Sequence, residues 1–233
     1  MRSLFHRFNF FFPALVFIFL AHSALCNNSV IPHDFEIWTP FYFQNIPVNN
    51  NLKGYLEIQP RYSFEPIKTE VLLIRPALYL NLPNGWSTWG GYAAVPNYYP
   101  NYILEQRSWQ QLQNIHLFGD VTVINRFRFE QRYFNNLSST GFRYRYQLRT
   151  LIPFDSQKKW SLAFYNEIFL NGNTVTGGPV AGLDQDRAFA GINHKLTPNI
   201  ALEAGYLYQT INLPNSDVFP VNHTFCCSTY ISF

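Results

Sequence analysis

The chain has 233 residues, of which 18% are aromatic and only 13% are charged. Soluble domains carry about 25% charged residues, so this composition disfavours an ordinary soluble domain. The formal net charge is +3, from 17 Lys and Arg against 14 Asp and Glu. This balance excludes the strongly basic character of nucleic-acid-binding proteins, and we expect no nucleic-acid partner.

The first 26 residues have the features of a secretory signal peptide. Arg2, His6 and Arg7 form a basic start, an apolar run follows over 8–20, and small residues come next. The apolar run is too short for a comfortable membrane span, which takes about 20 residues. Cleavage after Ser23 and cleavage after Cys26 fit the pattern equally well. We take 1–26 as the signal peptide and 27–233 as one mature domain.

The rest of the chain alternates apolar and polar residues with the period of β-strands and shows no helical periodicity. Turn signals such as Pro83-Asn84-Gly85 and Gly119-Asp120 separate the strands. We predict strands over 34–43, 53–64, 69–82, 86–95, 103–115, 119–133, 141–152, 160–171, 185–196, 199–210 and 221–233. Most of these strands reach the ~9–11 residues that a tilted membrane strand requires.

This series of strands predicts an all-β fold, a single antiparallel up-and-down transmembrane β-barrel. The series contains an odd number of strands, whereas bacterial single-chain barrels have even numbers. We therefore expect a further element within 27–52 and about 12 strands, with 10 as the alternative. If Phe233 ends in the periplasm, the short turns fall on the periplasmic side. The longer loops 96–102, 134–140, 172–184 and 211–220 then fall outside.

One hairpin shows the strictest alternation in the chain. Residues 126–133 read Arg-Phe-Arg-Phe-Glu-Gln-Arg-Tyr, and residues 142–149 read Phe-Arg-Tyr-Arg-Tyr-Gln-Leu-Arg. Successive side chains of a strand point to opposite faces, so one face is rich in arginine and the other is mainly aromatic. A face with so many arginines must meet water or a closed polar interior. Together with the other strands, the hairpin predicts charges inside a barrel and aromatic rings towards lipid.

Other strands repeat the charged face, for example with Glu57 and Arg61. We predict that an interior polar network contains Arg75, Glu105, Arg107, Arg126, Arg128, Glu130, Arg132, Arg143, Arg145, Arg149, Glu167, Arg187 and Glu203. Buried charges require opposite charges and hydrogen bonds. The network therefore either fills the barrel by cross-strand pairing or binds an anion, such as lipid phosphate, lipopolysaccharide core or a small acidic solute. We expect an interfacial girdle of tryptophans at Trp86, Trp89, Trp109 and Trp160.

The last predicted strand ends on the terminal phenylalanine. Phe225, Ile231 and Phe233 fall on one face, and we predict that they form a C-terminal assembly signal. An amphipathic last strand with a terminal Phe resembles the signal that directs proteins to the outer-membrane assembly machinery, which we expect as a partner during biogenesis. Cys226 and Cys227 are adjacent and point to opposite faces of a strand. We expect them to be small packing residues rather than a disulfide.

An ordered series of short motifs resembles a known bacterial family. The motifs are Arg-Pro-Ala-Leu-Tyr at 75–79, Trp-Gly-Gly-Tyr at 89–92, Glu-Gln-Arg-Ser-Trp-Gln-Gln at 105–111, Arg-Phe-Glu-Gln-Arg at 128–132, Arg-Tyr-Arg at 143–145, Asn-Glu at 166–167, Asp-Arg at 186–187 and Glu-Ala-Gly-Tyr at 203–206. Over nearly the whole mature chain the sequence is similar to the bacterial domain-of-unknown-function family 2490. The resemblance implies an outer-membrane β-barrel and brings no established activity and no catalytic residue.

Two classes of function fit these observations. The favoured class is a non-catalytic barrel of the bacterial outer membrane, a small-solute channel or a structural surface protein, with outer-membrane lipids and lipopolysaccharide as partners. The alternative is an interfacial lipid-modifying enzyme of the phospholipase or lipid deacylase type, and a soluble periplasmic ligand-binding barrel is a more distant reading. His33, His116, His194 and His223 form no motif of such enzymes. No spacing matches a metal site, so we expect no catalytic residue, cofactor or metal.

Overall fold

A computed structural model describes residues 33–64, 67–98, 101–213 and 219–233. The regular structure of these residues is entirely β, as the sequence predicts. The strands are β1 (His33–Trp38), β2 (Phe41–Pro47), β3 (Leu52–Phe64), β4 (Ile67–Asn81), β5 (Trp86–Asn97), β6 (Ile103–Phe118), β7 (Val121–Phe134), β8 (Gly141–Pro153), β9 (Trp160–Asn171), β10 (Gly182–Lys195), β11 (Ile200–Ile211) and β12 (Val221–Ser232). In this part of the chain no helix is long and apolar enough to cross a membrane. The predicted signal peptide lies outside the described residues.

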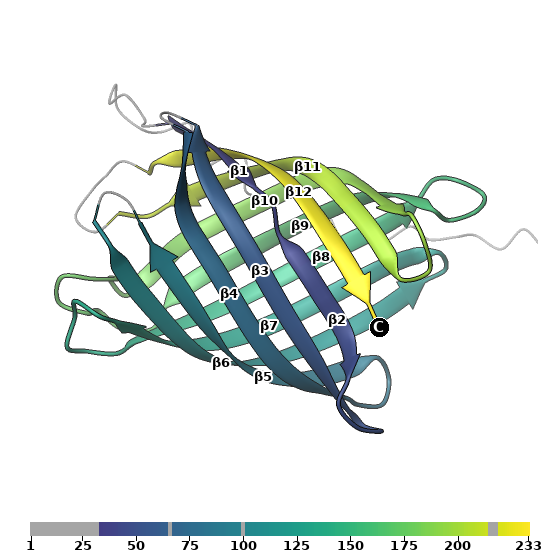
Figure 1. Ribbon diagram of the computed structural model, residues 1–233, viewed down its shortest axis with the longest axis horizontal. Coiled ribbons are helices and arrows are strands. Elements are labelled where there is room, and N and C mark those ends of the chain that lie inside the picture. The colour runs from purple at the N-terminus through teal and green to yellow at the C-terminus, as the bar shows by residue number, and fades with distance from the viewer. Residues whose placement is uncertain (1–32, 65–66, 99–100, 214–218) are drawn as a thin grey trace, which may run out of the picture. The chain divides into compact units, whose positions relative to one another are not determined.

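The strands close into one β-barrel (Figure 1). From β3 to β12 each strand pairs antiparallel with the strand that follows it in the chain, which confirms the up-and-down arrangement. The barrel closes where β12 pairs in parallel with both β1 and β2, and we call this junction the parallel seam. Figure 1 shows the seam where the last strand, in yellow, lies beside the first strands, in purple.

The first two strands share one position in the barrel wall. Both pair with β12 on one side and with β3 on the other. Thr39 and Pro40 separate them, and proline cannot donate the hydrogen bond that a continuous ladder requires. The structure thus confirms about 12 strands, with the further element in the region where the sequence predicts it. Because β1 and β2 fill one position, the barrel has an odd number of positions, and its first and last strands run in the same direction.

The two ends of the barrel differ in their connections. The turns 48–51, 82–85, 119–120, 154–159 and 196–199 lie at the end where β12 reaches Phe233, and we call it the turn end. The loops 135–140 and 172–181 lie at the opposite end, the loop end, in agreement with the topology expected from the sequence. Positive φ angles at Asn84, Gly85 and Gly119 suit tight turns between antiparallel strands.

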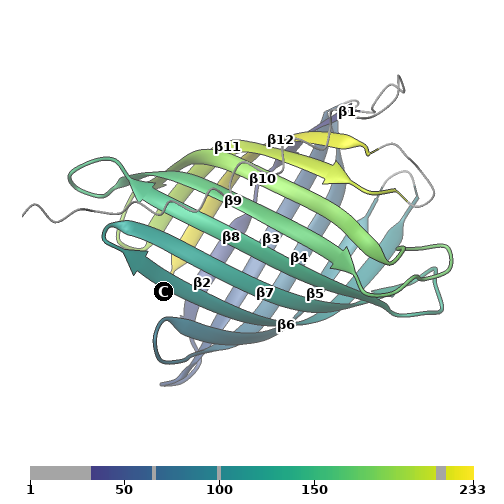
Figure 2. The same cartoon turned by 180° about the vertical axis from the view of Figure 1, so that it is seen from behind.

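Side chains alternate between the interior and the outer wall along each strand. On the central hairpin, Arg128 and Arg145 are 5% and 6% exposed and point inward, whereas Phe127 and Tyr144 are 53% and 54% exposed and point outward. Figure 2 shows the wall that contains this hairpin, with β7 and β8 side by side. The faces are therefore those that the alternation in the sequence predicts.

The expected tryptophan girdle is wrong for two of its four members. Trp109 is only 1% exposed and lies inside the barrel, and Trp89 stacks at 3.9 Å on the ring of Tyr79, which also lines the interior. Trp109 is two residues from Arg107 on β6, so the period of the strand turns it inward. Trp86 and Trp160 begin their strands near the turn end and are about 40% exposed, at 38% and 42%.

Candidate functional site: the charged interior

Every residue of the predicted polar network faces the barrel interior. Most are buried, and Arg126 and Arg149 are partly exposed within the cavity. The hairpin of β7 and β8 carries the largest share, and strands from β4 to β11 supply the others. Glu57 and Arg61, which the sequence places on the charged face, also point inward, and the structure adds Glu36 and Asp184. Whether the network serves packing or binding depends on how these charges are paired.

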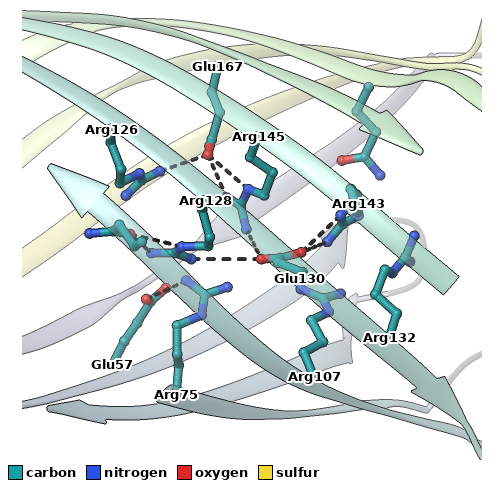
Figure 3. Close-up of polar contacts among 12 residues, drawn as sticks. Glu57, Arg75, Arg107, Arg126, Arg128, Glu130, Arg132, Arg143, Arg145 and Glu167 are labelled. Atoms are coloured by element: carbon teal, nitrogen blue, oxygen red, sulfur yellow. Dashed lines mark hydrogen bonds and ion pairs between the residues drawn. The ribbon is translucent and has the colours of Figure 1, made fainter. Parts of the chain in front are cut away.

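Glu130 forms the most enclosed part of the network. It is 0% exposed, and each of its carboxylate oxygens accepts hydrogen bonds from an arginine of β8. Arg143 Nη2 lies 2.6 Å from Glu130 Oε2, and Arg145 Nη1 lies 2.7 Å from Glu130 Oε1. Arg145 continues to Glu167 at 2.7 Å and Arg143 to Asp184 at 3.0 Å. We call these five residues the Glu130 cluster, and it ties four consecutive strands together. Figure 3 shows Glu130, Arg143, Arg145 and Glu167 of this cluster.

Further carboxylates pair with the remaining arginines of the wall. Glu105 lies between Arg107 and Arg132, with N–O distances of 2.7 and 2.5 Å. Arg149 reaches across from β8 to Glu203 on β11, where Tyr230 also donates a hydrogen bond to the carboxylate. Such buried pairs are favourable only when hydrogen bonds satisfy the remaining polar atoms. In these pairs the carboxylates meet that condition.

Three interior arginines are held by amide oxygens and aromatic rings instead. Arg61 donates to Gln59, Arg128 to Gln111 and Arg187 to Gln209, at 3.1, 2.7 and 2.8 Å. Their guanidinium groups lie over aromatic rings, as cation–π contacts require, on Trp38 for Arg61 and Arg187, on Trp109 for Arg128, and on Phe169 for Arg187. An amide and a ring orient a guanidinium but carry no negative charge. The positive charge of these arginines is therefore incompletely neutralised.

The packing around Arg128 fixes its position. Its Cζ atom lies 4.3 Å from the centre of the Trp109 ring. That ring needs the glycine at Gly91 on the neighbouring strand, because a Cβ atom there would lie 2.6 Å from Trp109. Arg75 and Arg126 flank Arg128 in the interior (Figure 3). We call Arg75, Arg126 and Arg128 the Arg128 cluster.

A cavity of about 660 Å³ runs inside the barrel. It reaches Leu82 and Gly85 at the turn end and extends past the Arg128 cluster to Asn97 on the loop side. Aromatic side chains line it together with the charges, among them Tyr42, Tyr55, Tyr79 and Tyr165. The interior thus combines cationic groups, amides and rings around open space.

Acidic groups gather at the loop end. Asp34, Glu36 and Glu70 bring carboxylate oxygens within 4.8 Å of one another. Glu36 also accepts hydrogen bonds from Trp38 and Asn222. The sequence does not predict this group of carboxylates, because its formation depends on how β1 is placed in the barrel wall. The positive charges of Arg61 and Arg187 act on Glu36, so cations partly balance these carboxylates.

The described histidines lie on the outer wall or at the strand ends. His33 Nδ1 lies 2.8 Å from His223 Nε2, and His223 Nδ1 lies 2.5 Å from the hydroxyl of Tyr206. His194 stacks on Trp160 at 3.8 Å. Asn193 points the other way and donates to Glu203. In the described residues none of the contacts of these histidines involves a serine.

The predicted assembly-signal residues lie on the outer wall. Phe225 and Phe233 are 54% and 64% exposed, and Ile231 is partly exposed on the same face of β12. Cys226 and Cys227 are both free, with Cys226 buried inside and Cys227 exposed outside. The alternation of the last strand is therefore the one that the sequence predicts.

Comparison with known proteins places the chain in a family. The family model described as "Protein of unknown function (DUF2490)" matches residues 35–219. The chain belongs to this family. An uncharacterized protein of Methylorubrum extorquens is 30% identical over 185 residues, which cover 77% of this chain and 80% of the relative. No solved structure matches the chain. Membership of the family confirms the resemblance of the motifs and assigns no activity.

Proposed function

We propose that the protein is an outer-membrane β-barrel that acts without catalysis and takes up small solutes into its charged interior. The proposal rests on the contrast between the polar inner face and the apolar outer face of one closed barrel. Charged and amide side chains point inward around a cavity of about 660 Å³, and large apolar side chains point outward on many strands. Transmembrane barrels have this arrangement because lipid covers the wall and water fills the lumen.

The outer wall supports a lipid environment over a soluble one. Large apolar side chains that are 38–54% exposed lie around the wall at Ile74, Leu78, Tyr92, Leu112, Phe127, Tyr144, Phe164, Leu170, Ile192, Leu202, Tyr206 and Phe225. Soluble monomers rarely expose apolar patches larger than a few hundred Å². A soluble ligand-binding barrel would turn its rings inward and its arginines outward, opposite to the faces described.

The side chains of the interior support a non-catalytic role. Each carboxylate of the Glu130 cluster is paired with an arginine, which holds it in the charged form without a free site for a substrate proton beside it. The contacts of the described histidines are with tyrosine, tryptophan, phenylalanine and other histidines. We expect purified, folded barrel to leave phospholipid and lipopolysaccharide chemically unchanged. Release of fatty acid by the wild-type protein would contradict this part of the proposal.

The proposed location in the outer membrane is tested by measuring how well the barrel assembles there when Phe233 is changed. Deleting Phe233, or replacing it with Asp, removes the terminal apolar group of β12, and we expect less folded barrel in the outer-membrane fraction. Folded barrel is measured as the species that migrates differently on gels before and after heating. The matched control is Phe219→Asp, which alters an exposed Phe outside the last strand. Normal accumulation of both variants would refute the terminal-strand signal.

Cysteine labelling tests the orientation of the faces. In a chain that carries Cys26→Ser, Cys226→Ser and Cys227→Ser, we expect Phe127→Cys to react with lipid-soluble reagents. Gln113→Cys, at a position that lines the cavity, should react with water-soluble reagents instead. The pair controls for local reactivity, because both positions lie on neighbouring strands of the same wall. Labelling of Phe127→Cys by water-soluble reagents alone would reverse the faces and exclude a membrane barrel.

A further inference from the structure

Arg128 carries a buried positive charge whose ion pair, with Glu130, is long. Its side chain is 3% exposed, and its Nε and Nη2 atoms both donate to Gln111 Oε1, at 2.9 and 2.7 Å. Nη1 makes no hydrogen bond with any described residue, and it lies 3.9 Å from Glu130 Oε1. A buried charge without full compensation is unfavourable. In the described residues, therefore, one N–H group of Arg128 makes no hydrogen bond, and its positive charge is only partly neutralised.

Arg75 and Arg126 extend this cationic region. Each has one carboxylate partner, Glu57 for Arg75 and Glu167 for Arg126, both at 2.7 Å. Glu167 is shared with Arg145 from the Glu130 cluster. The Nε atoms of Arg75 and Arg126 are buried and make no hydrogen bond within the described residues. The Arg128 cluster thus contains more positive charge than its carboxylates neutralise.

The three arginines also repel one another. Arg75 and Arg126 both lie close enough to Arg128 for their like charges to act on it. Figure 3 shows the guanidinium groups of Arg75 and Arg128 converging from two sides, with Glu57 next to Arg75. Negative charge placed between them relieves this repulsion, because the Coulomb energy in a poorly hydrated interior is larger than in water.

The cavity gives an anion a path to this cluster. All three arginines line it. Towards the turn end the lining includes Gln44 and Asn45 together with the paired Arg149 and Glu203. On the loop side Arg61, Arg107 and Arg132 line the cavity. An anion that enters the cavity therefore meets arginines on both sides of the cluster.

We propose that the Arg128 cluster is a binding site for a small oxyanion, the carboxylate or phosphate group of a soluble solute. Guanidinium groups bind such groups through forked, charge-assisted hydrogen bonds. The oxyanion accepts hydrogen bonds from the guanidinium groups of Arg75, Arg126 and Arg128, which line the cavity, and its charge offsets the excess of cations. This inference deepens the proposed uptake of small solutes, on which it rests, by naming the class of solute and the residues that bind it.

Isothermal titration calorimetry on the full, folded barrel in detergent tests the site. We expect saturable heat with sodium phosphate or sodium acetate, and none with sodium chloride at the same ionic strength. Arg128→Gln should weaken the affinity by about tenfold or more, as expected for the loss of a charged hydrogen-bond donor. The matched control is Lys158→Gln, which removes an exposed cation paired with Asp120 in a turn. It should bind as the wild-type protein does.

Several results would overturn the site. They are the absence of saturable heat with both oxyanions, equal heat with chloride, unchanged affinity in Arg128→Gln, and an equal loss in Lys158→Gln. If Arg128→Gln does not fold, Arg128→Lys decides, because it keeps the charge and removes the planar fork. We expect it to bind more weakly, and unchanged affinity would refute the geometry. The titration requires no membrane, so its failure is distinguishable from failure of the location and labelling experiments.

Discussion

Arg128 and Glu130 lie two positions apart on β7 and both point inward, yet their surroundings differ in charge. Glu130 receives hydrogen bonds from Arg143 and Arg145 on the neighbouring strand. Arg128 is held by Gln111 and by the ring of Trp109. Opposite charges neutralise Glu130. An amide and an aromatic ring hold Arg128 in position without neutralising its charge fully.

The difference indicates that stability and binding reside in different parts of one network. The Glu130 cluster connects β7, β8, β9 and β10 through carboxylates that satisfy one another's arginines. Removing one member leaves others uncompensated in the interior. The Arg128 cluster brings together arginines of β4 and β7, and its own charge excess already opposes folding. A substitution in the Glu130 cluster should therefore cost stability, and the removal of Arg128, which has no short ion pair, should cost little.

The largest effect is expected for Glu130→Ala. Because Arg143 and Arg145 each lose one of their two carboxylate partners in the interior, the free energy of unfolding should fall by about 3–5 kcal/mol. Denaturant titration of the refolded barrel, followed by tryptophan fluorescence, measures the change. Asp120→Ala is the control, since Asp120 forms an exposed ion pair with Lys158 and such pairs contribute little. Equal midpoints for wild type and Glu130→Ala would mean that the Glu130 cluster does not stabilise the barrel.

A smaller effect is expected for the pair of Arg149 and Glu203. This pair joins β8 to β11 and is slightly more exposed than Glu130, with 13% of the Arg149 side chain accessible. Glu203→Gln should destabilise the barrel, and the double variant Glu203→Gln with Arg149→Met should recover part of the loss. The coupling energy of the double-mutant cycle should be about 1–3 kcal/mol. Additive losses in the cycle would show that the two side chains do not act as a pair.

The sequence predicts the barrel and its faces because a period of two residues determines both. The same period could have placed Trp109 and Gln111 inside, since they continue the inward series from Glu105. The expected place of Trp109 in an interfacial girdle is wrong because that expectation rests on its residue type, whereas its position in the strand places it inside. Which arginines receive carboxylates and which receive amides depends on register between strands, and the sequence alone does not give register.

The sequence also does not predict two irregular features of the sheet, a β-bulge in β10 and the parallel seam. A register shift between Leu183 and Gln185 accompanies the inward contact of Asp184 with Arg143, and simple alternation cannot predict such a bulge. The interruption at Pro40 has a clear sequence signal, but the parallel seam it accompanies does not. Pairing between the first and last strands is a non-local choice that depends on closure of the whole barrel.

The smallest effect on stability is expected for Arg128→Met. The substitution keeps an unbranched side chain against Trp109 and removes a buried charge whose ion pair with Glu130 is long, at 3.9 Å. Removing such a charge relieves the repulsion from Arg75 and Arg126, and this gain offsets the lost hydrogen bonds to Gln111, worth about 1.5–3 kcal/mol for a charged donor. We therefore expect a denaturation midpoint close to that of the wild-type barrel, in contrast to Glu130→Ala. A loss as large as that of Glu130→Ala would erase the distinction between the two clusters, because it would show that Arg128 is neutralised as completely as Arg143 and Arg145.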